Sequence, residues 1–145
     1  MDPAFLAPTE VMESDHPRVQ SLVAELTADA ADAPQRLCRL FEHARDAVRY
    51  GVYSRFDQRD AYRATVTLDR GVGYCVQKAV VLVTLARAAG FPARLTAVDI
   101  RNQRAPEYLV QLMGTDRFAF HCYASVHLQG RWVALTPAFD AETCE

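Results

Sequence analysis

The first third of the chain has the spacing of two amphipathic helices. Each begins with an aspartate that can serve as N-cap and a proline in the first turn: Asp15 with Pro17, and Asp32 with Pro34. Apolar residues follow at intervals of three and four: Val19, Leu22, Val23 and Leu26, then Leu37, Leu40, Phe41, Ala44 and Val48. The first helix is predicted to run to about Ala31, and Gly51 ends the second.

The middle of the chain changes character twice. Residues 52–73 are mixed and aromatic without a clear period, which predicts a long irregular segment with one helical turn near residues 60–64. Such a segment in a compact domain is often functional. Residues 76–89 then predict a helix that is apolar on most of its circumference and therefore buried, and Gly90 and Pro92 stop it.

The remainder of the chain predicts strands. We expect a strand at residues 93–100, a short helix at 105–113 ended by Gly114, and a strand at 118–128. The last of these alternates, with Phe118, Phe120, Cys122, Ala124, Val126 and Leu128 on one face and Ala119, His121, Tyr123, Ser125 and His127 on the other. Gln129 and Gly130 form a two-residue hairpin turn to a return strand at 131–135. Helices followed by an antiparallel hairpin predict one α+β domain over residues 1–145.

Composition and charge exclude several classes of protein. Half of the 145 residues are hydrophobic and 23% are charged, which is typical of a globular domain. The net charge of −2 and the absence of a Lys/Arg run argue against nucleic acid as a partner. The N-terminal residues lack the pattern of a signal peptide, and the apolar run at 76–89 is too short to span a bilayer. We therefore expect a cytoplasmic protein without a membrane partner, and nothing in the sequence indicates its oligomeric state.

The cysteines are widely spaced, and one of them is a candidate nucleophile. Cys38, Cys75, Cys122 and Cys144 are expected to be free thiols, because the chain is rich in core residues and has no export signal. Gly71 and Gly73 let the backbone before Cys75 turn tightly and approach a ligand. The helix start behind Cys75 favours the thiolate, which is the nucleophilic form. The alternative is that Cys75 only fills a buried gap.

A thiolate nucleophile needs a base, and His121 is the candidate. His16 and His43 are expected at the surface. If residues 129–130 form a two-residue loop, His121 lies opposite Ala138, with Thr136 and Asp140 as diagonal neighbours. Asp140 could then orient the imidazole, although Pro137 cannot donate to the ladder and pairing can break before it. Because His121 and Cys122 point to opposite faces, they cannot chelate together, and we expect no metal and no cofactor.

Two segments resemble the transglutaminase-like superfamily of cysteine acyl-transfer enzymes. They are GYCVQKAVVLVTLARAAGFPARL (residues 73–95) and FHCYASVHLQGRWVALTPAFD (residues 120–140). The family pattern is a Gly-x-Cys opening a buried helix, an exit into a strand through Gly-Phe-Pro-Ala-Arg, a strand led by histidine, and Gly-x-Trp-Val. Small bacterial members also resemble the chain at SDHP (14–17), MGTD (113–116) and TPAF (136–139). The resemblance implies a papain-like core in which N-terminal helices and the nucleophile helix pack on an antiparallel sheet, with Cys75 as nucleophile and His121 as base.

The chain departs from the family pattern at its C-terminal end. Where many members complete a catalytic triad with aspartate, this chain has Thr136. Asp140 is the substitute that we expect, because threonine cannot stabilise an imidazolium electrostatically. Tyr123 stands where tryptophan is common, and Ser125 where glutamate is. Members of the small bacterial group continue with more sheet and loop, which leaves open that this chain is a fragment.

The expected function is cysteine-dependent acyl transfer, or hydrolysis of an amide or peptide bond, through a thioester acyl-enzyme. The substrate is a peptide, a protein or a small-molecule amide, and hydrolysis is favoured over cross-linking. One alternative is transfer like that of the arylamine N-acetyltransferases, although their doubled glycine-rich lead is not evident here. The other is a catalytically inactive transglutaminase-like module that binds a peptide or scaffolds a partner.

Overall fold

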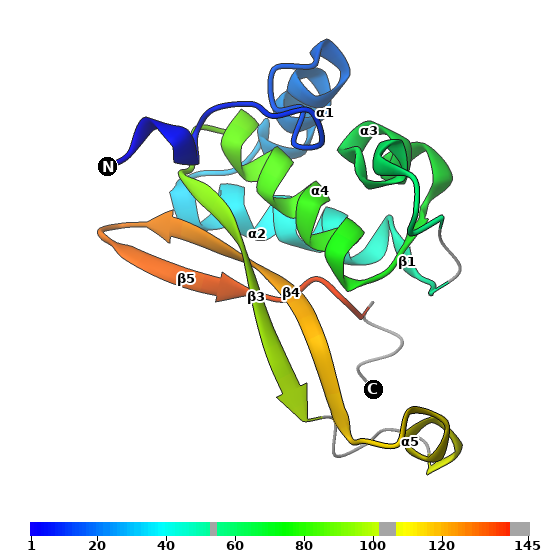
Figure 1. Ribbon diagram of the computed structural model, residues 1–145. Coiled ribbons are helices and arrows are strands. Elements are labelled where there is room, and N and C mark those ends of the chain that lie inside the picture. Colours follow the sequence, from blue (N-terminus) through cyan, green and yellow to red (C-terminus); the bar gives the residue numbers. More distant parts are fainter. Residues whose placement is uncertain (53–54, 102–106, 140–145) are drawn as a thin grey trace.

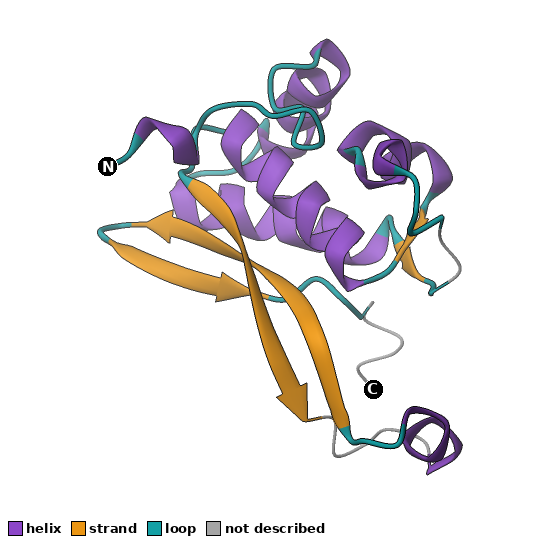
Figure 2. Cartoon of the chain, viewed as in Figure 1, coloured by secondary structure: helices purple, strands orange, loops and turns teal. Residues whose placement is uncertain are grey.

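The computed structural model describes residues 1–52, 55–101 and 107–139, in which a layer of helices packs on a small twisted sheet (Figure 1; Figure 2). The helices are α1 (Pro17–Thr27), α2 (Ala33–Asp46), α3 (Ala64–Arg70), α4 (Cys75–Ala88) and α5 (Glu107–Met113). The main sheet is antiparallel in the order β3 (Ala93–Arg101), β4 (Arg117–Leu128) and β5 (Arg131–Leu135). The α+β prediction is confirmed.

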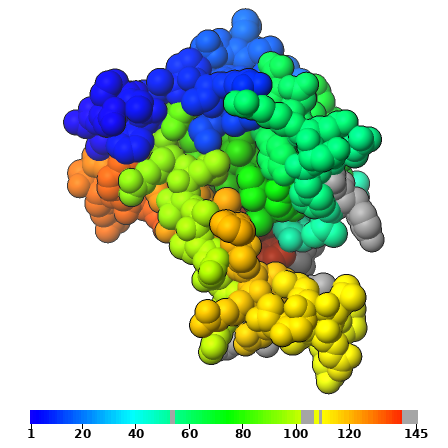
Figure 3. Space-filling view, viewed as in Figure 1, coloured from blue at the N-terminus to red at the C-terminus, as the bar shows by residue number. Residues whose placement is uncertain are grey.

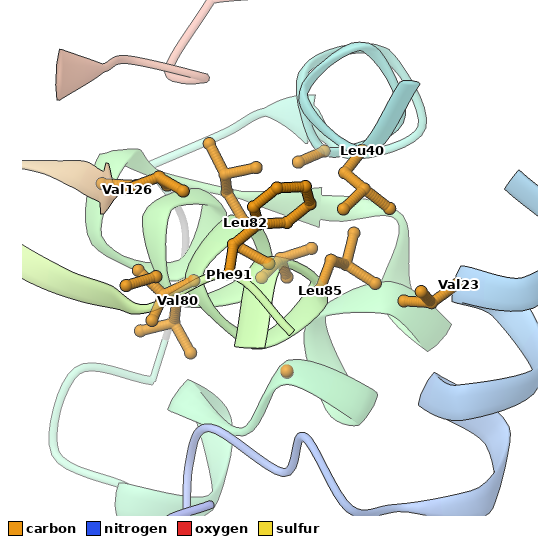
Figure 4. Close-up of a cluster of buried hydrophobic side chains, with 14 of the residues drawn as sticks. Val23, Leu40, Val80, Leu82, Leu85, Phe91 and Val126 are labelled. Carbon is orange, nitrogen blue, oxygen red and sulfur yellow. The ribbon is translucent and has the colours of Figure 1, made fainter. Parts of the chain in front are cut away.

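The core is built around α4, which contacts α1, α2 and α3 on one side and β3 and β4 on the other. Its side chains Val81, Leu82, Val83 and Leu85 are fully buried, as the apolar pattern predicts. Figure 4 shows Leu82 and Leu85 of α4 next to Leu40 of α2, in one cluster of buried hydrophobic side chains. Within the described residues, no helix combines the length and the apolar character needed to cross a membrane.

The first two helices begin close to their predicted positions and end earlier. The cap of α1 is His16, not Asp15: its Nδ1 accepts the Arg18 N–H at 3.2 Å. Asp32 caps α2 as predicted, with its Oδ1 2.8 Å from the Gln35 nitrogen. The prediction that Gly51 ends α2 is wrong, because the chain leaves the helix after Asp46 to form a strand.

That strand belongs to a structure that the sequence pattern did not predict. β1 (Arg49–Tyr50) pairs in parallel with β2 (Val72–Gly73), and this ladder places Tyr50 beside Gly73. Between them lie a 3₁₀ helix, η2 (Arg59–Tyr62), and α3, so the described part of the predicted irregular segment is largely ordered structure.

The cap of α3 comes from a distant part of the chain. The buried Glu13 carboxylate accepts the backbone N–H of Thr65 at 3.0 Å and its hydroxyl at 2.8 Å. The Arg63 guanidinium donates to the same carboxylate at 2.6 and 3.0 Å. Burial raises the pKa of Glu13, but these hydrogen bonds outweigh it and lower the pKa below its ordinary value.

The hairpin has the predicted turn and register. Leu128 pairs with Arg131 and Ala124 with Leu135. Gln129 and Gly130 have φ angles of 50° and 84°, the two positive values that a type I′ turn requires. Pairing ends at Leu135, before Pro137, which has no N–H to donate. The predicted pairing of His121 with Ala138 is therefore wrong, and His121 pairs with Val98 of β3.

Candidate active site

Cys75 is the first residue of α4, and the helix start around it is fixed by buried polar contacts. Tyr74 is the N-cap, and its backbone N–H donates to Oε1 of Gln77 at 3.2 Å. The buried Gln77 amide also donates to the Ala61 carbonyl at 2.8 Å, which ties the helix start to η2. The Cys75 side chain is partly exposed at this rigid position, and its thiol is free.

The two glycines before Cys75 serve different purposes. Gly71 ends α3 in the left-handed region at φ 62°, so the predicted tight turn is present. Gly73 is packed closely: a Cβ there would lie 3.1 Å from Cβ of Gln77 and 3.2 Å from Cγ2 of Thr67. The space beside Gly73 is thus filled by the protein itself, and not by a ligand as its sequence position suggested.

His121 lies on β4 directly after an irregularity in the ladder. Val98 pairs with His121 and Ile100 with Phe118, so β4 contains one residue more than β3 between these pairs. The extra residue forms a β-bulge at Phe120, which adopts φ 59° and donates its N–H to Oδ1 of Asp99 at 3.3 Å. Bulges redirect neighbouring side chains. The predicted alternation consequently holds from Cys122 onward and fails at Phe120, whose side chain is 76% exposed.

Cys75 and His121 line the same cavity, whose volume is about 420 Å³. Figure 3 shows a hollow between the green body of the molecule and the projecting yellow α5, with the red C-terminal segment at its base. Most of the other lining residues are aromatic or aliphatic: Tyr50, Tyr74, Val76, Ile100, Phe118, Ala119, Phe120 and Phe139, together with Arg101. The structure thus brings together the two residues that the sequence singles out, which lie 46 positions apart.

The aromatic wall of the cavity was not predicted. Tyr74 adjoins Cys75 in the sequence and could have been inferred from that alone. Tyr50 reaches the cavity only through the β1–β2 ladder, and Phe139 packs against Tyr50 with ring centroids 5.0 Å apart. Neither contact has a local signal.

The electrostatics of the cavity follow from burial. Burial lowers the pKa of His121, so its imidazole is neutral at neutral pH. Burial also raises the pKa of Tyr50 and of Cys122, and a thiolate at Cys75 raises both further. Burial raises the pKa of Tyr74 as well. The hydrogen bond that joins its hydroxyl to that of Tyr62 at 3.1 Å contributes to this rise. The two tyrosine hydroxyls, the Cys122 thiol and the His121 imidazole are therefore uncharged at neutral pH.

The third predicted member of the triad, Asp140, lies outside the described residues. Thr136 is exposed and does not line the cavity. Over residues 1–52, 55–101 and 107–139, no carboxylate lines the cavity and the His121 imidazole makes no hydrogen bond. The last described residue, Phe139, does line it.

The remaining histidines and cysteines lie elsewhere. His16 caps α1, His43 is half-buried in α2, and His127 packs against Trp132 with ring centroids 5.4 Å apart. Cys38 is exposed and Cys122 buried, and both are free thiols as predicted, whereas Cys144 is not among the described residues. In the part of the chain that the structure describes, no three His, Cys, Asp or Glu side chains are grouped as metal ligands.

The bulge gives a prediction about stability. Phe120 holds a left-handed conformation that costs a non-glycine residue about 1–2 kcal/mol, and asparagine tolerates it better. Because the Phe120 side chain is largely exposed, Phe120→Asn should be at least as stable as wild type. Phe120→Val, with its branched Cβ, should lose about 1–2 kcal/mol. Urea unfolding of the two variants checks this, and equal stabilities would contradict the strained geometry.

Comparison with known proteins identifies related folds. A candidate cysteine protease from Cytophaga hutchinsonii matches 92% of the chain with a TM-score of 0.72 at 19% identity. The periplasmic domain of TgpA from Pseudomonas aeruginosa matches 94% with a TM-score of 0.63 at 21% identity. The chain spans 40% and 48% of these two structures, respectively. A candidate protease from Parabacteroides distasonis matches 82% at 13% identity, with a TM-score of 0.54 and 23% of its own length covered.

No curated protein matches the sequence. The family model of the transglutaminase-like superfamily matches residues 20–137. This range includes α2, α3, α4 and the whole antiparallel sheet, and it contains both Cys75 and His121. The chain therefore belongs to the transglutaminase-like superfamily.

Proposed function

We propose that the protein catalyses acyl transfer or hydrolysis at an amide or peptide bond through a thioester on Cys75. The observation that carries the proposal is that Cys75, at the start of a buried helix, and His121, on a strand, line one cavity. A nucleophile and a base that line one concave site are the core of thiol catalysis. The transglutaminase-like family model and the fold similarity to a candidate cysteine protease agree with this chemistry.

The proposed reaction has two halves. His121 accepts the Cys75 proton, and the sulfur attacks the acyl carbonyl carbon to form a C–S bond. The C–N bond of the amide then breaks, and the leaving amine takes the proton from His121. In the second half His121 accepts a proton from water, or from an acceptor amine, as that group attacks the thioester. The C–S bond breaks and the proton returns to the thiol.

The helix start supplies part of the electrostatic stabilisation. The Cys75 N–H is among the first four backbone N–H groups of α4, which have no carbonyl partner one turn earlier. It is our candidate donor to the oxyanion of the tetrahedral intermediate. We propose Asp140 as the group that orients His121, because the residue before it, Phe139, lines the same cavity.

One observation favours a second candidate, a transglutaminase-like module that binds a peptide without turnover. Within the described ranges His121 has no carboxylate partner, and burial alone sets the direction of its pKa shift. Such a module would present Cys75 as an ordinary thiol.

The alkylation rate of Cys75 as a function of pH distinguishes the two. For an enzyme we expect Cys75 to react with iodoacetamide at pH 7 about tenfold or more faster than the exposed Cys38, because thiols without a base titrate near 8.5. Burial lowers the pKa of His121 below the ordinary histidine value of about 6.5. At any pH above 6.5 the imidazole is therefore mostly neutral and can accept the thiol proton. The low-pH fall in rate should therefore lie below 6.5. Peptide mass spectrometry reads both cysteines in one sample.

His121→Ala is the matched variant for this measurement. It should remove the excess reactivity of Cys75 and leave that of Cys38 unchanged, since Cys38 lies on α2. If Cys75 is no more reactive than Cys38 and does not respond to His121→Ala, the enzymatic proposal fails and the binding module takes its place.

A further inference from the structure

The wall of the cavity has a chemical bias. Five aromatic side chains line it, together with Val76 and Ile100, and the only ionised side chain among its described lining residues is Arg101. Arg101 already has Asp116 4.0 Å away. An acyl donor with a carboxylate side chain would bring a negative charge against the electron-rich faces of these rings, with only the already paired Arg101 to offset it, which is costly. An apolar side chain would instead displace water from apolar surface.

Further apolar side chains are exposed at the rim of the cavity and on α5. Phe120 lines the cavity and is also 76% exposed, so it forms part of the rim. On α5, Tyr108 is 71%, Leu112 81% and Met113 42% exposed. This helix projects from the end of the β3–β4 ribbon, well away from the other helices (Figure 1), and Figure 3 shows it as the far side of the hollow. Large apolar side chains gathered in this way mark interaction surfaces.

The extent of this surface separates a polypeptide from a small ligand. Small molecules are buried over most of their surface within the cavity that binds them. Here the exposed apolar residues of α5, Tyr108, Leu112 and Met113, extend over roughly 8 Å of helix outside the cavity. An extended chain covers about 3.3 Å per residue, so about two to three residues of a bound segment would cover this part of α5, in addition to those that reach it from the cavity.

We infer that the acyl donor of this site is an apolar polypeptide segment, one side chain of which enters the aromatic cavity while its neighbours lie on Phe120 and the apolar face of α5. The inference rests on the proposed function for the role of donor. It concerns binding, so its test does not require turnover.

The test is equilibrium binding to the full chain carrying Cys75→Ser, which cannot form a thioester. The probes are a fluorescein-labelled hexapeptide of alternating phenylalanine and glutamine, and the same peptide with serine in place of each phenylalanine. By fluorescence anisotropy we expect the phenylalanine peptide to bind at least tenfold more tightly. Phe120→Asn and Leu112→Gln, each introduced alone, should weaken it threefold or more. Leu6→Gln makes the same substitution at another exposed leucine, near the opposite end of the molecule, and should have no effect.

Three results would overturn the inference. They are equal affinities for the two peptides, no response to either variant, and competition by N-acetylphenylalanine amide at the same concentration as the peptide. The last would indicate a small-molecule donor. If the phenylalanine peptide is preferred but Cys75 of the wild type is unreactive, the proposed enzyme is refuted and the binding surface stands. If Cys75 is reactive but the two peptides bind equally, the proposed enzyme stands and the binding surface is refuted.

Discussion

Lys78→Met is expected to lower the free energy of unfolding by about 3 kcal/mol. Lys78 is the only lysine of the chain and is fully buried. Its ammonium donates to the Arg45 carbonyl at 2.7 Å and to the Val48 carbonyl, at and just beyond the end of α2. A cation there also complements the negative end of the helix dipole.

The sign of this effect depends on what methionine leaves behind. Replacing both partners of a buried hydrogen bond by apolar groups is often nearly neutral, but removing one partner leaves the other unsatisfied and is destabilising. Methionine keeps most of the side-chain volume and supplies no donor, so the buried Val48 carbonyl loses a charged partner worth about 1.5–3 kcal/mol. The partly buried Arg45 carbonyl loses the same partner at a smaller cost, because water can reach it. The saved desolvation of the ammonium offsets part of this loss.

Arg36→Met is the matched control. Its guanidinium donates to the Ala89 carbonyl at 3.0 Å, at the end of α4, and so also satisfies a helix C-terminus. Because this contact is only partly buried, water can replace it, and the loss should stay under about 1 kcal/mol. Urea unfolding measures both variants. A Lys78→Met protein as stable as wild type would contradict the account. Lys78→Met should also slow Cys75 alkylation. Strand β1, which carries Tyr50 to the cavity, follows Val48 directly, so loss of the Lys78 contact to Val48 should disturb the cavity wall.

Glu13→Gln is expected to cost about 2 kcal/mol at pH 7. The Glu13 side chain is buried, and its carboxylate serves both as the N-terminal cap of α3 and as the partner of Arg63. Glutamine retains one acceptor oxygen but no charge, and its NH₂ group faces donors. The lost charge-assisted hydrogen bonds to Thr65 account for most of the effect, because Arg63 is 41% exposed and water can solvate it.

The loss should depend on pH in a defined direction. The folded-state pKa of Glu13 is lowered, so its contribution is fully present above its ordinary value of about 4.5 and disappears as the pH falls through the folded-state pKa. The difference between wild type and Glu13→Gln should therefore shrink below pH 4.5. Glu10→Gln breaks the exposed ion pair with Arg59 and should cost less than about 0.5 kcal/mol at any pH. Urea unfolding at pH 7 and pH 3.5 tests both. If the stability lost in Glu13→Gln is the same at both pH values, Glu13 does not stabilise the fold as an ionised carboxylate.

Local patterns predicted the elements whose causes are local. The apolar circumference of residues 76–89 predicted α4 to within one residue, and Gln129-Gly130 predicted the turn and register of the hairpin. The side chain of Asp32 is three residues from the N–H that it caps. In each case the residues that determine the structure are sequence neighbours.

The elements that were missed depend on distant residues. Glu13 caps α3 from 52 positions away, and β1 exists only because β2 lies beside it. At the site, Cys75 and His121 stand out by chemistry and by resemblance, and the structure brings both to one cavity. The geometry around His121 was not accessible from the alternating pattern, because the bulge at Phe120 is stabilised by Asp99 from a strand 21 positions earlier. The assignment of Asp140 remains a prediction.

Chemical modification of the buried Lys78 can be used to measure how often α2 and α4 separate in the folded protein. In the folded protein the only side-chain amine has no solvent-accessible surface, so an acylating reagent such as an N-hydroxysuccinimide ester can modify it only while α2 and α4 are separated. An adduct located on the Lys78 peptide by mass spectrometry then reports opening of the layer that holds Cys75, without an introduced label. The same isolation means that attachment to an amine-reactive surface will leave the interior of the folded domain unmodified.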